Sequence, residues 1–201
     1  MDVVVPADRV TRWVSNFAVR HGPATLSTAD GALAGVADDG STFAARLPFG
    51  CTYAGPADAE SFAAAIGVPD DWGVLLVRKG GFAVARLRGT EVVSSKVGQR
   101  HVQGRTKAGG QSQQRFARRR DNQARRAFEA AADHAARILG GLTGPVVTGG
   151  DRAAVEEVLA DPRLRALPVA GSWLAVPDPR RGVLEQAVVD ACAARIAVQN
   201  A

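Results

Sequence analysis

Three apolar runs within residues 72–97 constrain the fold of this chain more than any other feature. They are short, and glycine-containing turns separate them, which is typical of consecutive strands in an antiparallel sheet. The runs are Trp72–Arg78, Phe82–Leu87 and Glu91–Val97, with Gly80-Gly81 and Gly89-Thr90 between them. The sequence therefore predicts a three-stranded meander.

A long helix is predicted after the meander, from Ser112 to Leu139. Ser112 suits the N-cap position, because its hydroxyl can accept a hydrogen bond from a backbone N–H of the first turn. Gly140-Gly141 would end the helix. Apolar side chains recur at spacings of three, four and seven residues, so one helix face should cover the sheet while the arginines point elsewhere. That apolar stripe consists of Ala117, Ala124, Phe128, Ala131, Ala135 and Ile138.

The sequence after residue 144 alternates between strand and helix patterns. We expect strands at Pro145–Thr148 and Val169–Val176, and helices at Arg152–Leu159 and Val183–Val198, with Asp151 capping the first of these helices. Alternating elements after a meander favour a mixed β-sheet flanked by helices. The fold class is therefore α+β or α/β.

Residues 1–68 read as a small α+β unit that precedes this pattern. A helix is expected over 6–20, short antiparallel strands over 24–55, and a second helix from Pro56 to Ile66. The predicted domains are this unit, 1–68, and a second domain, 69–201.

Positive charge is concentrated in residues 96–126. This segment holds ten Lys/Arg and one acid, a net charge of +9, whereas the other 170 residues hold 15 Lys/Arg against 19 Asp/Glu, a net charge of −4. A basic block on a mildly acidic body is typical of a nucleic-acid interface. A solvated basic helix face is the alternative. A membrane-surface helix is disfavoured, because Phe116 is the segment's one large apolar side chain.

An exposed loop over residues 98–111 is predicted inside this basic segment. Gly109-Gly110 let the backbone adopt a positive φ and approach another molecule closely, because neither residue has a Cβ. Gln111 then presents an uncharged amide that both donates and accepts hydrogen bonds. Such a loop suits insertion into a pocket walled by RNA.

The stretch from Gly104 to Arg120, GRTKAGGQSQQRFARRR, resembles the catalytic segment of archaeal and eukaryotic class-one peptide release factors. The resemblance covers about residues 70–200, the middle domain of such a factor with its GGQ motif. No segment looks like the stop-codon-reading domain of that family. The chain therefore looks most like Vms-type release factors, which act on stalled ribosomes, and in particular like their actinobacterial branch.

The resemblance implies a peptidyl-tRNA hydrolase that releases nascent chains from stalled ribosomes without reading a codon. Gln111 would be catalytic, Gly109 and Gly110 would shape its approach, and the proton would be moved mainly by the tRNA 2′-hydroxyl and ribosomal RNA. The implied partners are large-subunit ribosomal RNA and peptidyl-tRNA, with a glutamine methyltransferase acting on Gln111. The residues expected to bind RNA are Arg100, Arg105, Lys107, Arg115, Arg118, Arg119 and Arg120.

Two other functions stay open on the sequence. Some Vms-type relatives are linked to cleavage near the tRNA 3′ end, so the chain could be a tRNA endonuclease, and His101 beside the loop could act as an acid or base. It could also be a non-enzymatic module that docks its basic loop on the ribosome or another RNA. Thr148–Asp151 could cradle a phosphate, but a structural turn is favoured because the motif lacks a P-loop lysine.

Composition argues against several other classes of protein. No run of 18 apolar residues and no signal-peptide pattern occurs, so we expect a cytoplasmic protein, monomeric and without membrane partners. Cys51 and Cys192 should be buried free thiols. Three scattered histidines and no CxxC motif predict that no metal is bound, and no cofactor is expected.

Overall fold

The computed structural model describes the backbone of residues 1–99 and 111–201, and the side chains of residues 1–98 and 125–201. Contacts divide the chain into two compact units, which we describe separately. Unit 1 comprises Met1–Val68, Ala170–Ser172 and Val188–Ala201, and unit 2 comprises Pro69–Val169 and Trp173–Ala187. The predicted α+β class with mixed sheet and flanking helices is confirmed.

Unit 2 is built on a four-stranded mixed sheet with the order β7-β6-β5-β8. The predicted meander forms β5, β6 and β7, whose neighbours are antiparallel, and β8 joins the sheet parallel to β5. Trp72 closes one end of the meander, where its indole Nε1 donates to Gly89 O at 2.8 Å. The strands are β5 (Trp72–Arg78), β6 (Gly81–Arg88), β7 (Glu91–Gln99) and β8 (Val146–Gly150).

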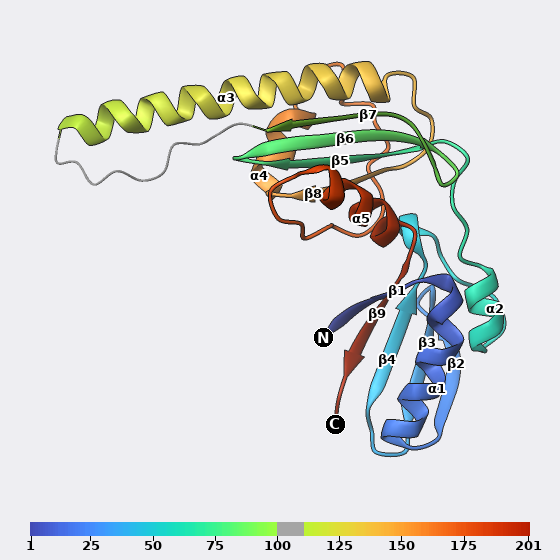
Figure 1. The fold of residues 1–201 in the computed structure, drawn as a ribbon. Helices are drawn as coiled ribbons and strands as arrows, with labels where there is room; N and C mark the ends of the chain where they lie inside the picture. Colours follow the sequence, from blue (N-terminus) through green and yellow to red (C-terminus); the bar gives the residue numbers. More distant parts are fainter. Residues whose placement is uncertain (100–110) are drawn as a thin grey trace. The chain divides into compact units, whose positions relative to one another are not determined.

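One face of this sheet is covered by α3 (Gln111–Leu139) and α4 (Arg152–Leu159). The predicted long helix is confirmed, and Figure 1 shows that its C-terminal half lies along the sheet while its N-terminal half extends past the strands. Small residues at the contact let helix and sheet approach closely. The buried α3 residues are Ala131, Ala132, Ala135 and Leu139.

The segment Leu174–Arg181 runs from β8 across the other face of the sheet. Leu174 pairs with Gly149 of β8, Val176 O accepts from Arg78 Nη1 at 2.8 Å, and Arg181 Nη1 donates to Ser95 Oγ of β7 at 3.2 Å. The strand expected over Val169–Val176 is wrong, because this stretch makes isolated bridges at its two ends instead. Gly171 between them has a φ of +86°, which interrupts an extended strand.

Unit 1 contains an antiparallel five-stranded sheet with the order β1-β9-β4-β3-β2. An aromatic cluster fills the space between this sheet and the first helix, with Trp13 and Phe17 each packed edge-on against Phe43. The elements are β1 (Asp2–Val5), η1 (Ala7–Arg9), α1 (Val10–His21), β2 (Ala24–Ala29), β3 (Ala32–Ala37), β4 (Thr42–Arg46), η2 (Pro48–Gly50), α2 (Ala59–Ala64) and β9 (Ala194–Gln199).

The helix expected over Val183–Val198 is wrong in its second half. Helix α5 spans Arg181–Ala191 and is followed by β9, which is paired on both sides, with β1 and β4. Ala194 and Ile196 alternate into the core, so burial and two ladders of hydrogen bonds outweigh a helical pattern there. Residues 188–201 consequently group with unit 1, and the domain boundary expected after residue 68 stays a prediction.

Candidate functional site

The predicted catalytic glutamine is the first residue of α3, and the last residue of β7 is Gln99. Residues 100–110, between them in the sequence, lie outside the described residues. Arg115, Arg118, Arg119 and Arg120 follow in the helical backbone of α3, in the stretch whose side chains are not described. Gly109, Gly110, Arg100, Arg105 and Lys107 lie outside the described residues. The described residues form the scaffold that carries Gln111.

That scaffold begins where α3 rests on the end of β7. The ring of Phe82 on β6 stacks on His134 of α3, with ring centroids 5.5 Å apart. Gly98 of β7 lies opposite Phe82 in the ladder, and a Cβ at Gly98 would overlap the Phe82 ring. The glycine thus leaves room for the aromatic ring that supports α3.

A second contact fixes the C-terminal end of α3. Arg86 on β6 forms two hydrogen bonds of 2.8 Å with the carboxylate of Asp71, and its Nη1 donates to Gly140 O at 3.1 Å. This arrangement lowers the pKa of Asp71, chiefly through the hydrogen bonds from Arg86. A cation at the carbonyl end of a helix also interacts favourably with the helix dipole.

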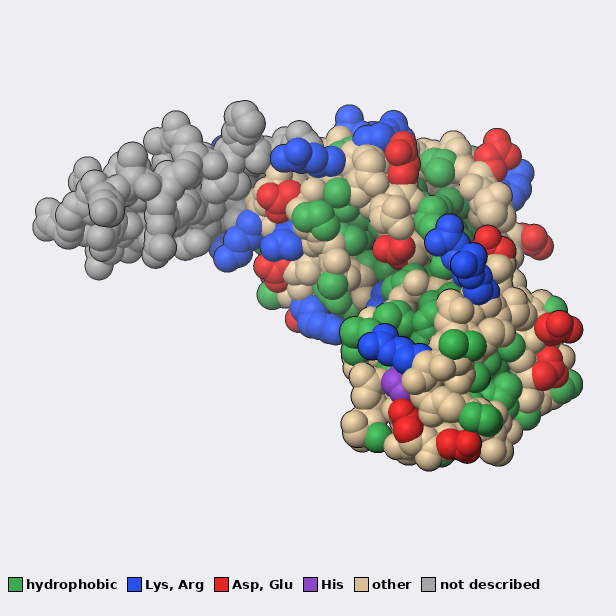
Figure 2. Space-filling view, turned by 60° about the horizontal axis from the view of Figure 1, so that its bottom comes forward, with side chains coloured by type: hydrophobic (Ala, Val, Ile, Leu, Met, Phe, Trp, Pro, Cys, Tyr) green, Lys and Arg blue, Asp and Glu red, His purple; other side chains and the backbone are tan. Residues whose placement is uncertain are grey.

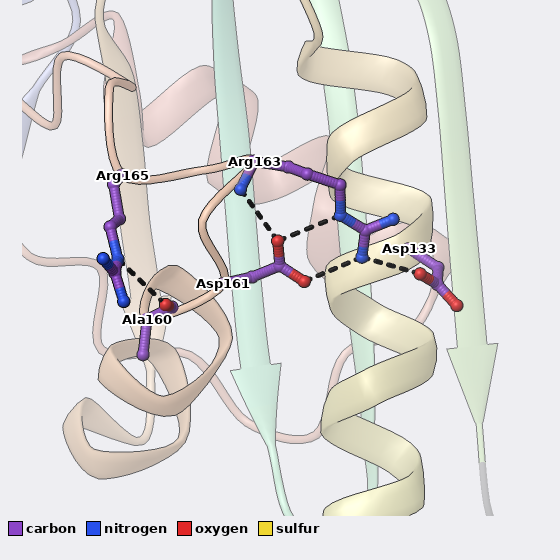
Figure 3. Close-up of polar contacts among 5 residues, drawn as sticks. All are labelled: Asp133, Ala160, Asp161, Arg163 and Arg165. Carbon is purple, nitrogen blue, oxygen red and sulfur yellow. Dashed lines mark hydrogen bonds and ion pairs between the residues drawn. The ribbon is translucent and has the colours of Figure 1, made fainter.

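A third contact joins α3 to the segment that follows α4 (Figure 3). Arg163 donates to Asp161 from Nε at 2.9 Å and from Nη2 at 2.7 Å, and the same Nη2 lies 2.7 Å from Asp133 Oδ1 on α3. The hydrogen bonds from Arg163 lower the pKa of Asp161 to about 2 and raise the pKa of Arg163. The Asp161 side chain is therefore ionised at neutral pH and holds the guanidinium in place.

These three contacts are all made by the C-terminal part of α3. Asp133 is 22 residues beyond Gln111, so at 1.5 Å per residue the helix between them spans about 33 Å. Figure 1 shows that the N-terminal half of this span runs beyond the sheet. Gln111 is thus carried at the end of an arm that is fixed at its other end.

Cations of the described body extend the basic character of the site. Lys96 on β7 and Arg125, Arg126 and Arg137 on α3 are exposed. In Figure 2, Lys and Arg side chains gather on unit 2 beside the part that is not described, with acidic side chains among them. The sequence places these four residues in or near the basic segment, but it did not single them out as binding residues. For Lys96, the register of β7 against β6 adds that the residue lies opposite Val84, on the face of the sheet that α3 covers.

The turn at Thr148–Asp151 has a structural explanation. A Cβ on Gly149 would collide with Leu174 O, and Gly150 has a φ of +103°. Asp151 Oδ1 accepts from the backbone N–H groups of Ala153 at 3.1 Å and Ala154 at 3.4 Å. The carboxylate thereby occupies the position at the α4 N-terminus where a phosphate would bind.

Other chemistry receives little support from the described side chains. No group of three or more His, Cys, Asp or Glu that could hold a metal ion is found among them, and His101 lies outside them.

Both cysteines are free thiols. Cys51 is exposed, so its expected burial is wrong. Cys192 is partly buried, and burial raises the pKa of its thiol to about 11. Within the described part of the chain, none of the helices is both long and apolar enough to cross a membrane.

Comparison with known proteins gives one family match. Residues 70–197 match the family described as Actinobacteria/chloroflexi VLRF1 release factor. The match includes β5–β8, the whole of α3 and residues 100–110 before it. A comparison with curated proteins found no match.

Proposed function

Because the chain belongs to the Actinobacteria/chloroflexi VLRF1 release factor family, we propose that it hydrolyses the ester of peptidyl-tRNA on stalled ribosomes without reading a codon. Membership of this family confirms the resemblance to Vms-type release factors and implies action together with the ribosome. In this proposal the protein frees nascent chains in ribosome quality control. Its partners are large-subunit ribosomal RNA and peptidyl-tRNA.

The proposed chemistry relies on positioning rather than on a titrating side chain. Ester hydrolysis passes through a tetrahedral oxyanion, which a backbone N–H can stabilise. After two glycines, the N–H of Gln111 can approach that centre closely. The glutamine amide can orient water but does not titrate near neutral pH, so the tRNA 2′-hydroxyl and ribosomal RNA move the proton. The protein therefore needs the ribosome to be active.

The observation that carries the proposal is the position of Gln111 at the tip of an anchored helix. The residue opens α3, whose other end is held by Phe82, Arg86 and Arg163. A helix of this length can bring one residue into a narrow site while the body of the protein stays outside it. Arg115, Arg118, Arg119 and Arg120 follow within the first ten residues of that helix, where they would meet RNA phosphates together with Arg100, Arg105 and Lys107 of the loop.

The test is a single-turnover release assay on stalled ribosomes that carry a labelled peptidyl-tRNA. Gln111→Ala should lose peptide release by a factor of about 100 or more while it still co-sediments with ribosomes. The variant keeps the backbone N–H but loses the side-chain amide that orients water, and a misplaced reactant can cost about that factor. Gln114→Ala, which removes the same side chain one turn later, is the matched control. Undiminished release by Gln111→Ala would refute the catalytic assignment.

Analysis of the tRNA 3′ end in the same reaction separates the alternatives. Ester hydrolysis leaves an intact terminal adenosine, whereas an endonuclease leaves a shortened tRNA. A non-enzymatic binding module would leave the peptidyl-tRNA unchanged. Mass spectrometry of the protein isolated from its own cells tests whether a methyltransferase modifies Gln111.

A further inference from the structure

Four strands form the edges of the two sheets, β1 and β2 in unit 1 and β7 and β8 in unit 2. An edge strand presents unpaired backbone N–H and C=O groups, and most proteins protect it with a charge, a bulge, a proline, a short length or a covering segment. Three of these edges are protected. β1 has four residues and ends before Pro6, β7 carries Lys96 and a register shift, and Val169 and Leu174 bridge to the outer side of β8.

The fourth edge, β2, has none of these protections within the described residues (Figure 1). Its six residues, ATLSTA, include no charged residue and no proline, and four of them are exposed. All six pair with β3 in one unbroken register, from Ala24 opposite Ala37 to Ala29 opposite Ala32. β2 is therefore a regular, uncharged edge that another strand can extend.

The hairpin between β2 and β3 determines which backbone groups of β2 point outward. Asp30 and Gly31 have φ values of +49° and +71°, as in a two-residue type I′ turn, whose flanking residues form a hydrogen-bonded pair. Ala29 is one of these residues, and hydrogen-bonded pairs alternate with non-hydrogen-bonded pairs along an antiparallel ladder. The N–H of Asp38 donates to Pro23 O at 3.1 Å, which continues the same alternation at the other end of β2. The odd-numbered residues of β2 are therefore bonded to β3.

The even-numbered residues Ala24, Leu26 and Thr28 consequently direct their N–H and C=O groups away from the sheet. Among the described residues, none of these backbone groups has a hydrogen-bond partner. The hydroxyl of Thr28 donates to Gly55 O at 2.9 Å and leaves the Thr28 backbone unengaged. The free side of β2 thus offers a regular row of donors and acceptors.

We propose that β2 binds β2 of a second copy of this chain, antiparallel, so that the two unit 1 sheets form one continuous sheet. The chain is then a dimer rather than the monomer expected from the sequence. A two-fold axis perpendicular to the sheet at Leu26 places Leu26 opposite Leu26 of the second copy, and Ala24 opposite Thr28 of the second copy. Each opposed pair of outward-pointing residues exchanges two backbone hydrogen bonds, about six in total. This register pairs all the outward-pointing groups of both copies.

The chemistry of β2 favours a second copy as its partner. The strand is its own complement, because the two-fold axis sets each donor opposite an acceptor. No charged side chain lies on it, so two copies do not repel each other along the strand. Leu26 packs at the margin of the unit 1 core, and contact with the same side chain across the axis removes further apolar surface from water. β2 also lies outside residues 70–197, so the contact follows neither from the family match nor from the proposed function.

Sedimentation velocity and residue-resolved hydrogen exchange of the full chain, at concentrations from about 1 μM to about 1 mM, test the pairing. The sedimenting mass should double as the concentration rises. Over the same range the amide protons of Ala24, Leu26 and Thr28 should become protected, whereas those of Thr25 and Ser27 stay protected throughout because they donate to β3. A monomer at about 1 mM, or a dimer in which the three outward amides exchange freely, would overturn the proposal.

Two double variants test the register. Thr25 lies opposite Ser27 of the second copy, so Thr25→Lys/Ser27→Lys places like charges opposite each other and should weaken association by a factor of about 10 or more. Thr25→Lys/Ser27→Glu places opposite charges there and should associate at least as tightly as the unmodified protein. Undiminished association of the first variant would overturn the assignment to β2. Equal losses in both would overturn the register centred on Leu26.

Ala197→Lys/Gln199→Lys is the matched control. It adds the same two charges at exposed positions with the same spacing on β9, an inner strand of the same sheet. It should dimerise like the unmodified protein, and a loss equal to that of Thr25→Lys/Ser27→Lys would overturn the pairing by showing an effect of net charge. Thermal unfolding checks that each variant is folded. Where a variant does not fold, the exchange pattern of the unmodified protein decides.

Discussion

Arg163 Nη2 lies 2.7 Å from Asp133 Oδ1 and equally close to Asp161 Oδ2, so one guanidinium joins α3 to the segment after α4. Both ion pairs are solvent-exposed, and exposed pairs contribute little to stability. Their main effect is instead on the direction of α3, and so on the position of Gln111. A tilt of about 2° at Asp133 would move Gln111 by about 1 Å, because about 33 Å of helix separates them.

We expect Arg163→Ala to slow peptide release on the ribosome without weakening ribosome binding. A misplacement of about 1 Å at a reacting centre can cost a factor of about 100 in rate. The melting temperature should change little. Single-turnover release at saturating protein, beside co-sedimentation and thermal unfolding, measures the three effects separately.

Arg165→Ala is the matched control for this prediction. Arg165 lies two residues further along the same segment, is exposed, and donates from Nε to Ala160 O at 3.2 Å (Figure 3). It makes no hydrogen bond or ion pair with the side chains of α3 that the structure describes. Asp133→Asn should share the defect of Arg163→Ala, since it removes the other charge. Equal rates in the Arg163→Ala and Arg165→Ala proteins would contradict a positioning role.

We predict that the Phe82 ring can support α3 only if residue 98 has no side chain. Gly98→Ala should reduce the free energy of unfolding by about 1–3 kcal/mol, because the new methyl group overlaps the buried Phe82 ring. Gly182→Ala at the start of α5 serves as the control, with no atom near its new Cβ, and should be neutral or stabilising by up to about 1 kcal/mol. Urea unfolding compares them, and equal stability of the two variants would show that the ring moves aside freely.

His134 makes stability depend on pH in a defined direction. Its pKa in the folded protein is below the ordinary histidine value, so the unfolded chain binds the proton more readily. Its contribution to stability is complete above about pH 6.5 and declines as the pH falls from there toward the folded-state pKa. His134→Phe, which keeps an aromatic ring against Phe82, should lose this part of the pH dependence. Melting temperatures between pH 7.5 and 5.5 check this, and parallel curves for the two proteins would refute it.

The cap of α4 gives a fourth prediction. Asp151→Ala should destabilise the protein by about 1 kcal/mol, because two N–H groups of the first helical turn lose their acceptor. Asp151→Asn keeps an acceptor oxygen and should cost less. Thermal unfolding of both variants measures the difference, and the same loss in both would point to the charge rather than to the hydrogen bonds.

Strands and helices are predicted correctly from the sequence where turn residues and hydrophobic periodicity agree with the tertiary structure. Glycine-containing turns between apolar runs mark the meander of β5, β6 and β7, and Asp151 before an apolar helical stripe marks α4. The long helix follows from its alanine-rich stripe, which ends where Ala135 and Leu139 are buried under the sheet. In each case turn chemistry and hydrophobic period point to the same element.

Elements that depend on distant partners could not be read from the sequence. The segment of β9 has a helical pattern, and it becomes a strand because β1 and β4 flank it. β1 is likewise too short to be recognised without its partner. Phe82 and His134 are separated by 52 positions, and the stacking of their rings emerges only from the packing of α3 on the sheet.

The pairing of β1 with β9 has a consequence for the order of folding. Asp2 lies opposite Ala197, so nearly the whole sequence forms the loop that this ladder closes, and closing a long flexible loop costs conformational entropy. The meander of unit 2 is made of near neighbours in sequence and can form without that cost. Unit 2 lies in the sequence between the two main parts of unit 1. Once unit 2 has folded, the chain between β1 and β9 has less freedom left to lose when these strands pair. We therefore expect unit 2 to form early and the sheet of unit 1 to be completed last, when β9 enters between β1 and β4.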